Sequence, residues 1–161
     1  MEQISIDEID LKLLESMQTD ASLSNQTLAE RVHISPPTCL RRVKRLRDAG
    51  LVEREIALLS PGKLAAITGY GLTALVEITL DRQGAEQQEA FETRVAQDTA
   101  VQQCYRVSPG PDFMLVVHVA DMPRYLALAQ RLFTSDANVR NVKAFFSIKR
   151  TKFEPKVLLA Q

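Results

Sequence analysis

The stretch SNQTLAERVHISPPTCLRRVKRLRDAG, residues 24–50, predicts two short helices joined by a tight turn. Ser24 can cap the first helix through its side-chain oxygen, and Ser35 can cap the second. Two prolines follow Ser35 at positions where a helix needs no backbone N–H. Gly50 is suited to end the second helix, because glycine adopts the left-handed conformation found there. The stretch is therefore a candidate helix-turn-helix.

The second of these helices has an apolar and a basic side. Cys39, Val43 and Leu46, with Leu40 beside them, recur at helical spacing and are expected to pack on a core. The opposite side carries Thr38, Arg41, Arg42 and Arg45, flanked by Arg31, Lys44 and Arg47. Six basic residues and no acidic residue lie between Arg31 and Arg47.

This basic side predicts a surface that enters the major groove of double-stranded DNA, because guanidinium groups reach both phosphates and guanine edges. The start of the helix should lie deepest, so Thr38, Arg41 and Arg42 are predicted to face bases. Ser35 is also predicted to be a DNA-binding residue. Arg45, one turn later, is predicted to reach the phosphate backbone. The alternative is an ordinary amphipathic helix with a solvated charged face, although such faces usually mix both charge signs.

The segment ISPPTCLRRVKRLRDAGLV, together with the preceding IDEIDLKLLESMQTDASLSNQTLAERV, closely resembles the helix-turn-helix of the Lrp/AsnC transcription regulators. The preceding segment also predicts a first helix over residues 7–19, with Asp7 as its cap and Asp10 at the third helical position. One departure is His33, where the family often has glycine. Histidine tolerates a positive φ better than most side chains, so His33 is interpreted as structural.

Length and composition are those of a globular protein. The 161 residues are enough for two small domains, and the overall net charge is zero, so DNA binding has to come from a local basic patch. No apolar run is long enough to span a membrane, and the acidic, polar start is not a secretory signal. Cys39 and Cys104 lack metal-ligand spacing, which favours a reducing, cytoplasmic location without a metal or other cofactor. No catalytic motif is present, and the isolated His118 favours packing over catalysis.

The second half of the chain predicts the order strand, helix, strand, strand, helix, strand. The corresponding ranges are 70–80, 85–97, 101–108, 112–120, 122–133 and 138–153. This order is typical of a ferredoxin-like α+β domain, a four-stranded antiparallel sheet with two helices on one face. Three parts are expected: a winged helix-turn-helix domain over 1–59 with a wing strand after Gly50, a linker over 60–69, and the ferredoxin-like domain over 70–161.

The uncovered face of such a sheet is expected to carry apolar strand residues, among them Val76, Ile78, Val117 and Phe146. A bare apolar face of this size predicts a homodimer, because such patches are rarely left exposed to water. The resemblance further implies assembly to an octamer and an amino-acid-sensing role for this domain.

The loop VSPGPDF, residues 107–113, resembles the family segment that borders the effector pocket. The resemblance implies an effector site containing Gly110 and Asp112, with Phe146 and Ser147 on the last strand nearby. Pro109 stands where the family has glycine, and proline offers no N–H to an effector carboxylate. The alternative for Asp112 is a structural cap of a tight hairpin.

These features predict a non-enzymatic DNA-binding transcriptional regulator of the Lrp/AsnC type that responds to an amino acid or related metabolite through its assembly. One alternative is a ligand-independent architectural DNA-binding protein, for which Pro109 is the best argument. Another is a sirohaem decarboxylase-like subunit, which would need histidines or arginines around a tetrapyrrole and no basic recognition helix.

Overall fold

The computed structural model describes residues 5–69 and 71–159, which form two compact units. One unit comprises the chain up to Leu58 together with the tail from Lys152, and the other comprises Leu59–Thr151. The sequence prediction assigned this tail to the second domain. Instead, the backbone of Val157 and the side chain of Gln18 exchange hydrogen bonds of 2.9 and 3.0 Å, so the tail is tied to the first helix.

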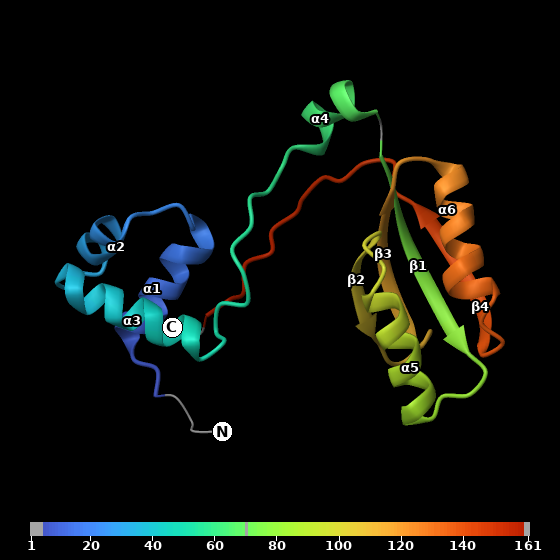
Figure 1. Ribbon diagram of the computed structural model, residues 1–161, viewed down its shortest axis with the longest axis horizontal. Helices are drawn as coiled ribbons and strands as arrows, with labels where there is room; N and C mark the ends of the chain where they lie inside the picture. Colours follow the sequence, from blue (N-terminus) through green and yellow to red (C-terminus); the bar gives the residue numbers. More distant parts are fainter. Residues whose placement is uncertain (1–4, 70, 160–161) are drawn as a thin grey trace. The chain divides into compact units, whose positions relative to one another are not determined.

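The first unit contains three helices: α1 (Glu8–Thr19), α2 (Asn25–Arg31) and α3 (Pro36–Asp48) (Figure 1). The predicted caps of the first two are confirmed. Asp7 and Asp10 form a reciprocal capping box at the start of α1, and the Ser24 side chain accepts the Thr27 N–H at the start of α2. The core of this unit is made of buried apolar side chains: Leu13, Met17, Leu28, Ala29, Val32, Cys39, Val43 and Leu46.

Two left-handed residues set the ends of α2 and α3. His33 has φ +56° and is the one non-glycine residue with a positive φ in the described part of the chain, which fits its interpretation as a structural turn residue. Gly50 has φ +74°, and the amides of Gly50 and Leu51 donate to the carbonyls of Arg47 and Leu46. This pair of bonds is a Schellman motif, which satisfies the last carbonyls of α3.

Two expectations for α3 are corrected. The Ser35 hydroxyl makes no capping bond to the backbone; it lies 2.8 Å from the hydroxyl of Thr38 instead. Leu40, predicted to pack with the core, is 61% exposed. The reason is the helical geometry: at 100° per residue, the Leu40 side chain lies about 100° around the helix from Cys39 and about 120° from Leu46.

The chain after Gly50 is extended but unpaired. Residues 51–59, predicted to hold the wing strand, form no β-ladder within the described chain. Their alternating pattern leaves Ile56 and Leu58 exposed to solvent rather than facing a neighbouring strand. The linker contains a helix, α4 (Pro61–Thr68), which buries none of its residues.

The second unit is the expected βαββαβ domain. Its strands and helices are β1 (Leu72–Leu80), α5 (Ala85–Ala96), β2 (Val101–Arg106), β3 (Phe113–Val119), α6 (Met122–Ala129), a π-helical extension η1 (Gln130–Thr134) and β4 (Val139–Phe146). The sheet is antiparallel, in the order β2-β3-β1-β4 (Figure 1). This is the ferredoxin-like order that the sequence predicts.

The prediction of which residues line the bare face of the sheet was wrong. Val76, Ile78 and Val117 are fully buried in the core formed with the helices, where they share a cluster with Phe91 of α5 and Leu128 of α6. Because side chains alternate along a strand, the opposite face carries the residues between them. Phe146 pairs with Ala74 on the helix-covered side and contacts the ring of Tyr125 edge-on at 5.0 Å.

The apolar part of the bare face is a row across three strands. Leu75 of β1 is paired with Val116 of β3 on one side and with Phe145 of β4 on the other. Leu75 and Phe145 are 43% and 52% exposed. The predicted exposed apolar face therefore exists, but with the other register of the same strands.

Candidate nucleic-acid interface

Arg41 lies on the solvent side of α3 and is not held by an acidic neighbour. Its position on the helix is opposite the buried Cys39, Val43 and Leu46. Within the described part of the chain, Arg41 is the one basic residue of α3 for which no ion pair or hydrogen bond is present. Its guanidinium is therefore available to an external acceptor.

Arg42 is held against the start of α1. Its Nη1 donates to Asp7 Oδ2 at 2.7 Å and to Asp10 Oδ1 at 2.9 Å, and its side chain is only 22% exposed. The Asp10 side chain is fully buried and also accepts a hydrogen bond from Arg45. Together with the capping box, these contacts make Asp10 the anchor between α1 and α3.

The pKa of the Asp7 carboxyl is lowered by this arrangement. The larger cause is the hydrogen bond from the Asp10 backbone N–H, and the next is the hydrogen bond from Arg42. The sequence prediction treated Asp7 and Asp10 as parts of a helix cap only. Nothing local to residues 7–10 indicates that two arginines more than 30 residues away bind the same carboxylates.

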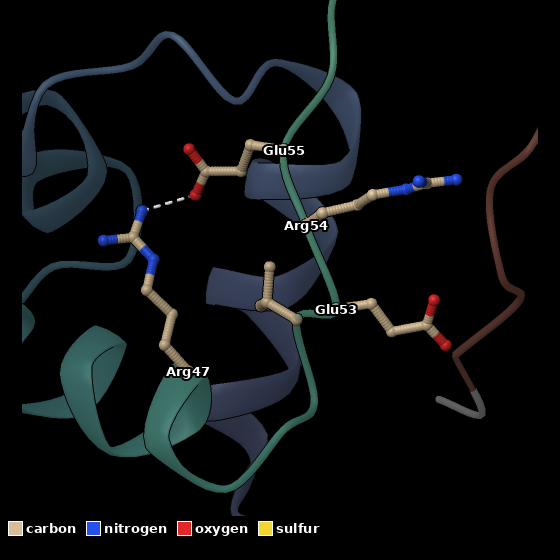
Figure 2. A pocket seen from close by; sticks show the side chains of 5 residues that line it. Arg47, Glu53, Arg54 and Glu55 are labelled. Atoms are coloured by element: carbon tan, nitrogen blue, oxygen red, sulfur yellow. Dashed lines mark hydrogen bonds and ion pairs between the residues drawn. The ribbon is translucent and has the colours of Figure 1, made fainter.

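Two further basic residues of α3 are paired at its C-terminal half. Lys44 contacts Asp48 one turn later at 2.5 Å, and Arg47 binds Glu55 in the segment after the helix. Figure 2 shows the Arg47 and Glu55 side chains pointing toward one another, while Glu53 and Arg54 point away from them. These residues and Val52 line an open hollow of about 350 Å³. The Arg47–Glu55 pair ties the extended segment to the end of α3.

The start of α3 is fixed by α2. Asn25 Nδ2 donates to the Pro36 carbonyl at 2.8 Å, and the hydroxyls of Ser35 and Thr38 are bonded to one another. A second hollow, of about 240 Å³, is lined by Asp7, Arg41, Arg42 and Arg45. Of the predicted DNA-binding residues, the structure therefore groups the arginines of α3 around one surface depression.

The four residues predicted to bind an effector do not meet in one chain. Asp112 immediately precedes the β3 residue paired with Ile78, whereas Phe146 pairs with Ala74 and the Ser147 amide donates to the Thr73 carbonyl. Four strand residues separate the two places, which is about 13 Å at 3.3 Å per residue. Gly110, with φ +127°, lies in the loop with Asp112.

Asp112 has a structural role at the end of β1. Its Oδ2 accepts the Leu80 backbone N–H at 2.7 Å and the Gln83 side-chain amide at 3.3 Å. Its own N–H donates to the Ile78 carbonyl, and the residue is 8% exposed. Asp112 thus has a structural role, but its carboxylate binds the end of β1 and the residue Gln83 after it, and not the β2–β3 hairpin that the alternative interpretation named.

We expect Asp112→Ala to lower the free energy of unfolding of the second unit by about 1–3 kcal/mol, because the buried Leu80 N–H loses its acceptor. Asp112→Asn keeps an oxygen at that position and should cost clearly less. Urea denaturation followed by circular dichroism compares the two variants. Equal stability of Asp112→Ala and the unmutated protein would contradict the structural role.

The described residues contain no cluster of three or more His, Cys, Asp or Glu side chains that could hold a metal ion. His118 is exposed, and its Nδ1 lies 3.0 Å from the Thr73 hydroxyl on the neighbouring strand. Cys39 and Cys104 are free thiols. In the described chain, no helix is both long and apolar enough to cross a membrane.

Comparison with known proteins identifies both units. Residues 73–157 match the Lrp/AsnC ligand binding domain, and residues 6–53 match a winged helix-turn-helix DNA-binding domain. The chain belongs to the Lrp/AsnC family. It is a transcriptional regulator of the Lrp/AsnC type with a helix-turn-helix and a regulatory ligand-binding domain, and its relatives are named as regulators, not enzymes.

Individual members of the Lrp/AsnC family are similar over nearly the whole chain. The DNA-binding transcriptional activator DecR of Escherichia coli K12 is 36% identical over 148 residues, which cover 92% of this chain and 95% of DecR. The leucine-responsive regulatory protein of Rhizobium meliloti is 33% identical over 150 residues, which cover 93% and 94%. The crystal structure of a Neisseria meningitidis transcriptional regulator in complex with L-Met superposes with a TM-score of 0.81, at 29% identity, covering 96% of this chain and 97% of that one.

Proposed function

We propose that this Lrp/AsnC chain binds double-stranded DNA by inserting α3 into the major groove, and that an amino acid or related metabolite regulates binding by shifting its assembly. The observation that carries the proposal is Arg41, whose guanidinium has no partner among residues 5–69 and 71–159 and lies on the solvent side of the second helix of a helix-turn-helix. In such motifs the second helix enters the groove with its N-terminal residues toward the bases. As a regulator of transcription, the protein would act in the cytoplasm.

The contacts divide the basic residues into three roles. Arg41 is the main base reader, and Ser35 and Thr38 lie beside it at the helix start. Arg42, bound to Asp7 and Asp10, is a positioning residue that fixes α3 on α1. This replaces the sequence-based assignment of Arg42 to base reading.

The remaining basic residues suit the phosphate backbone. Arg45 binds Asp10, as Arg42 does, but 43% of its side chain is exposed. The Lys44 side chain, paired with Asp48, is 74% exposed. Arg31 adds charge at the end of α2. Exposed cations of this kind give affinity that falls with salt and carries little sequence information.

The effector part of the proposal rests on linkage. A ligand that binds one assembly better than another shifts the population toward it, and with it the spacing of the recognition helices. The Neisseria relative was crystallised with L-Met, and other relatives are named leucine-responsive, which supports an amino acid as the effector class. Gly110, Asp112, Phe146 and Ser147 remain the candidate residues, and a site with both pairs would need two chains.

Selection of bound duplexes from a random DNA pool, with and without each of the twenty amino acids, tests this function. Enrichment of a defined sequence is expected, with the extent of enrichment or the half-site spacing changed by at least one amino acid. Failure to enrich any sequence would contradict the DNA-binding assignment. If a sequence is enriched but no amino acid alters the enrichment, the protein would be a ligand-independent architectural DNA-binding protein. This alternative is favoured by the Asp112 carboxylate, which already accepts a hydrogen bond from Leu80.

A homodimer formed through the bare face of the sheet, assembling further to an octamer, completes the proposal. Burying the row Val116, Leu75 and Phe145 would remove apolar surface from water in both chains. We expect light scattering at micromolar concentration to give at least twice the chain mass of 18.0 kDa, and Leu75→Glu to reduce it. A mass near that of one chain for the unmutated protein would contradict the dimer.

A further inference from the structure

Leu40 is the exposed apolar side chain of the recognition helix. It is 61% exposed, whereas Cys39, Val43 and Leu46 of the same helix are between 0% and 5% exposed. The core of the first unit is complete without it. An exposed leucine alone needs no explanation, but this one lies on the helix proposed to enter DNA.

The neighbours of Leu40 on the helix surface restrict what it can contact. Residues three or four apart share a stripe, so Pro37 and Lys44 adjoin Leu40 on the helix surface, and Arg41 follows directly in the sequence. An apolar protein surface docking on Leu40 would have to desolvate Lys44 and Arg41 as well, which is unfavourable without acidic partners. The major groove supplies an apolar group beside acceptors and phosphates, namely the C5 methyl of thymine.

We propose that Leu40 reads a thymine methyl in the major groove and so adds a preference for an A·T pair close to the base pair contacted by Arg41. The inference rests on the proposed DNA-binding function. Leu40 and Arg41 are consecutive, so their Cα atoms differ by only 1.5 Å along the helix axis. Their side chains diverge by about 100° around it, which lets one helix address neighbouring base pairs.

The experiment uses the full-length protein and the duplex enriched from the random pool. Each thymine of that duplex is replaced in turn by deoxyuridine, which removes only the C5 methyl, and binding is measured by fluorescence anisotropy at one salt concentration. One position per half-site is expected to lose about 3- to 10-fold in affinity, in keeping with burial of a single methyl group. Leu40→Ala should weaken binding to the thymine duplex by a similar factor and abolish the effect of the deoxyuridine at that position.

Leu126→Ala is the matched control. Leu126 is also a leucine on a helix, and it is likewise 61% exposed, but it lies on α6 of the second unit. This variant should respond to deoxyuridine as the unmutated protein does. Light scattering of Leu40→Ala should give an unchanged mass, since the side chain is assigned to DNA and to no protein interface.

The inference is overturned if no deoxyuridine position weakens binding, if Leu40→Ala and the unmutated protein respond equally, or if Leu40→Ala changes the assembly. These outcomes leave the proposed function standing, because a sequence has been enriched. Failure of the pool to enrich any sequence would overturn the proposed function and this inference together.

Discussion

Replacing Asp10 with alanine is expected to lower the free energy of unfolding of the helix-turn-helix unit by about 2–4 kcal/mol. Asp10 is fully buried and receives hydrogen bonds from the Asp7 backbone, from Arg42 and from Arg45. Without the carboxylate, Arg42 keeps only Asp7, so a partly buried guanidinium loses one of its two counter-charges. The junction between α1 and α3 should therefore loosen, although the apolar core is unchanged.

Two further variants test whether the charge of Asp10 accounts for the loss of stability. Asp10→Asn keeps an oxygen acceptor but removes the charge, so it should fall between alanine and the unmutated protein. Glu8→Ala removes the other acidic residue in the first turn of α1. Its pair with Lys12 is exposed, so this change should affect stability much less than Asp10→Ala. The measurement is urea unfolding monitored by circular dichroism. An Asp10→Ala variant as stable as Glu8→Ala would show that the network adds nothing to stability.

The same network gives stability a pH dependence of known sign. Because the pKa of Asp7 is lowered in the folded protein, its contribution is present above the ordinary aspartate pKa. That contribution is lost as the pH falls through the lowered value. The helix-turn-helix unit should therefore become less stable on acidification through this region, and neutral pH should leave the contribution intact.

The local part of the helix-turn-helix could be predicted because each signal acts within a few residues. Ser24 caps α2 through an amide three residues away, and Gly50 ends α3 through bonds to its own last turn. His33 adopts a positive φ because the turn requires one, whatever its side chain contacts. The order of strands and helices in the second unit was predictable for the same reason, since it follows from the periodicity of each segment.

Contacts between distant segments could not be predicted in this way. Asp10 and Arg42 are 32 residues apart, and the spacing within α3 alone indicates a row of four equivalent polar residues. In the structure these residues differ. Arg42 is partly buried against the carboxylates of Asp7 and Asp10, whereas Arg41 is unpaired within the described residues. The prediction of which residues line the bare face of the sheet was wrong for a related reason. A shift of one residue along β1 exchanges Leu75 for Val76 and so inverts which side chains face the helices.

The effector residues show the limit of an assignment by resemblance. Asp112 and Phe146 each match a family position, but the strand register places them near opposite ends of β1. The Asp112 Oδ2 also accepts hydrogen bonds from the Leu80 backbone N–H and the Gln83 side chain, so this oxygen already has partners within the chain. If the proposed effector contacts both pairs of residues, it would have to bind between two chains, and ligand binding would then depend on assembly.

Arg41→Ala is expected to cause the largest loss of sequence discrimination. A guanidinium that bonds bidentately to guanine contributes about 1–3 kcal/mol of discrimination, which corresponds to about 5- to 150-fold per half-site. Arg41 can make this contact without first breaking an ion pair in the described chain, unlike Arg42, Arg45 and Arg47. Its removal also leaves no buried carboxylate without a partner, so the fold should be unaffected.

The measurement is the ratio of affinities for the enriched duplex and a random duplex across a salt series. Arg41→Ala should lower this ratio, whereas Arg45→Ala should weaken both duplexes alike and reduce the salt slope by about 1 per site, as expected of a phosphate contact. Arg42→Ala should lower stability and, at a temperature where the protein remains folded, largely preserve the ratio, because its guanidinium is committed to Asp7 and Asp10. If Arg42→Ala lowered the ratio and Arg41→Ala did not, the Asp10 network would have to open on DNA binding, and the unpaired state of Arg41 would carry no functional meaning.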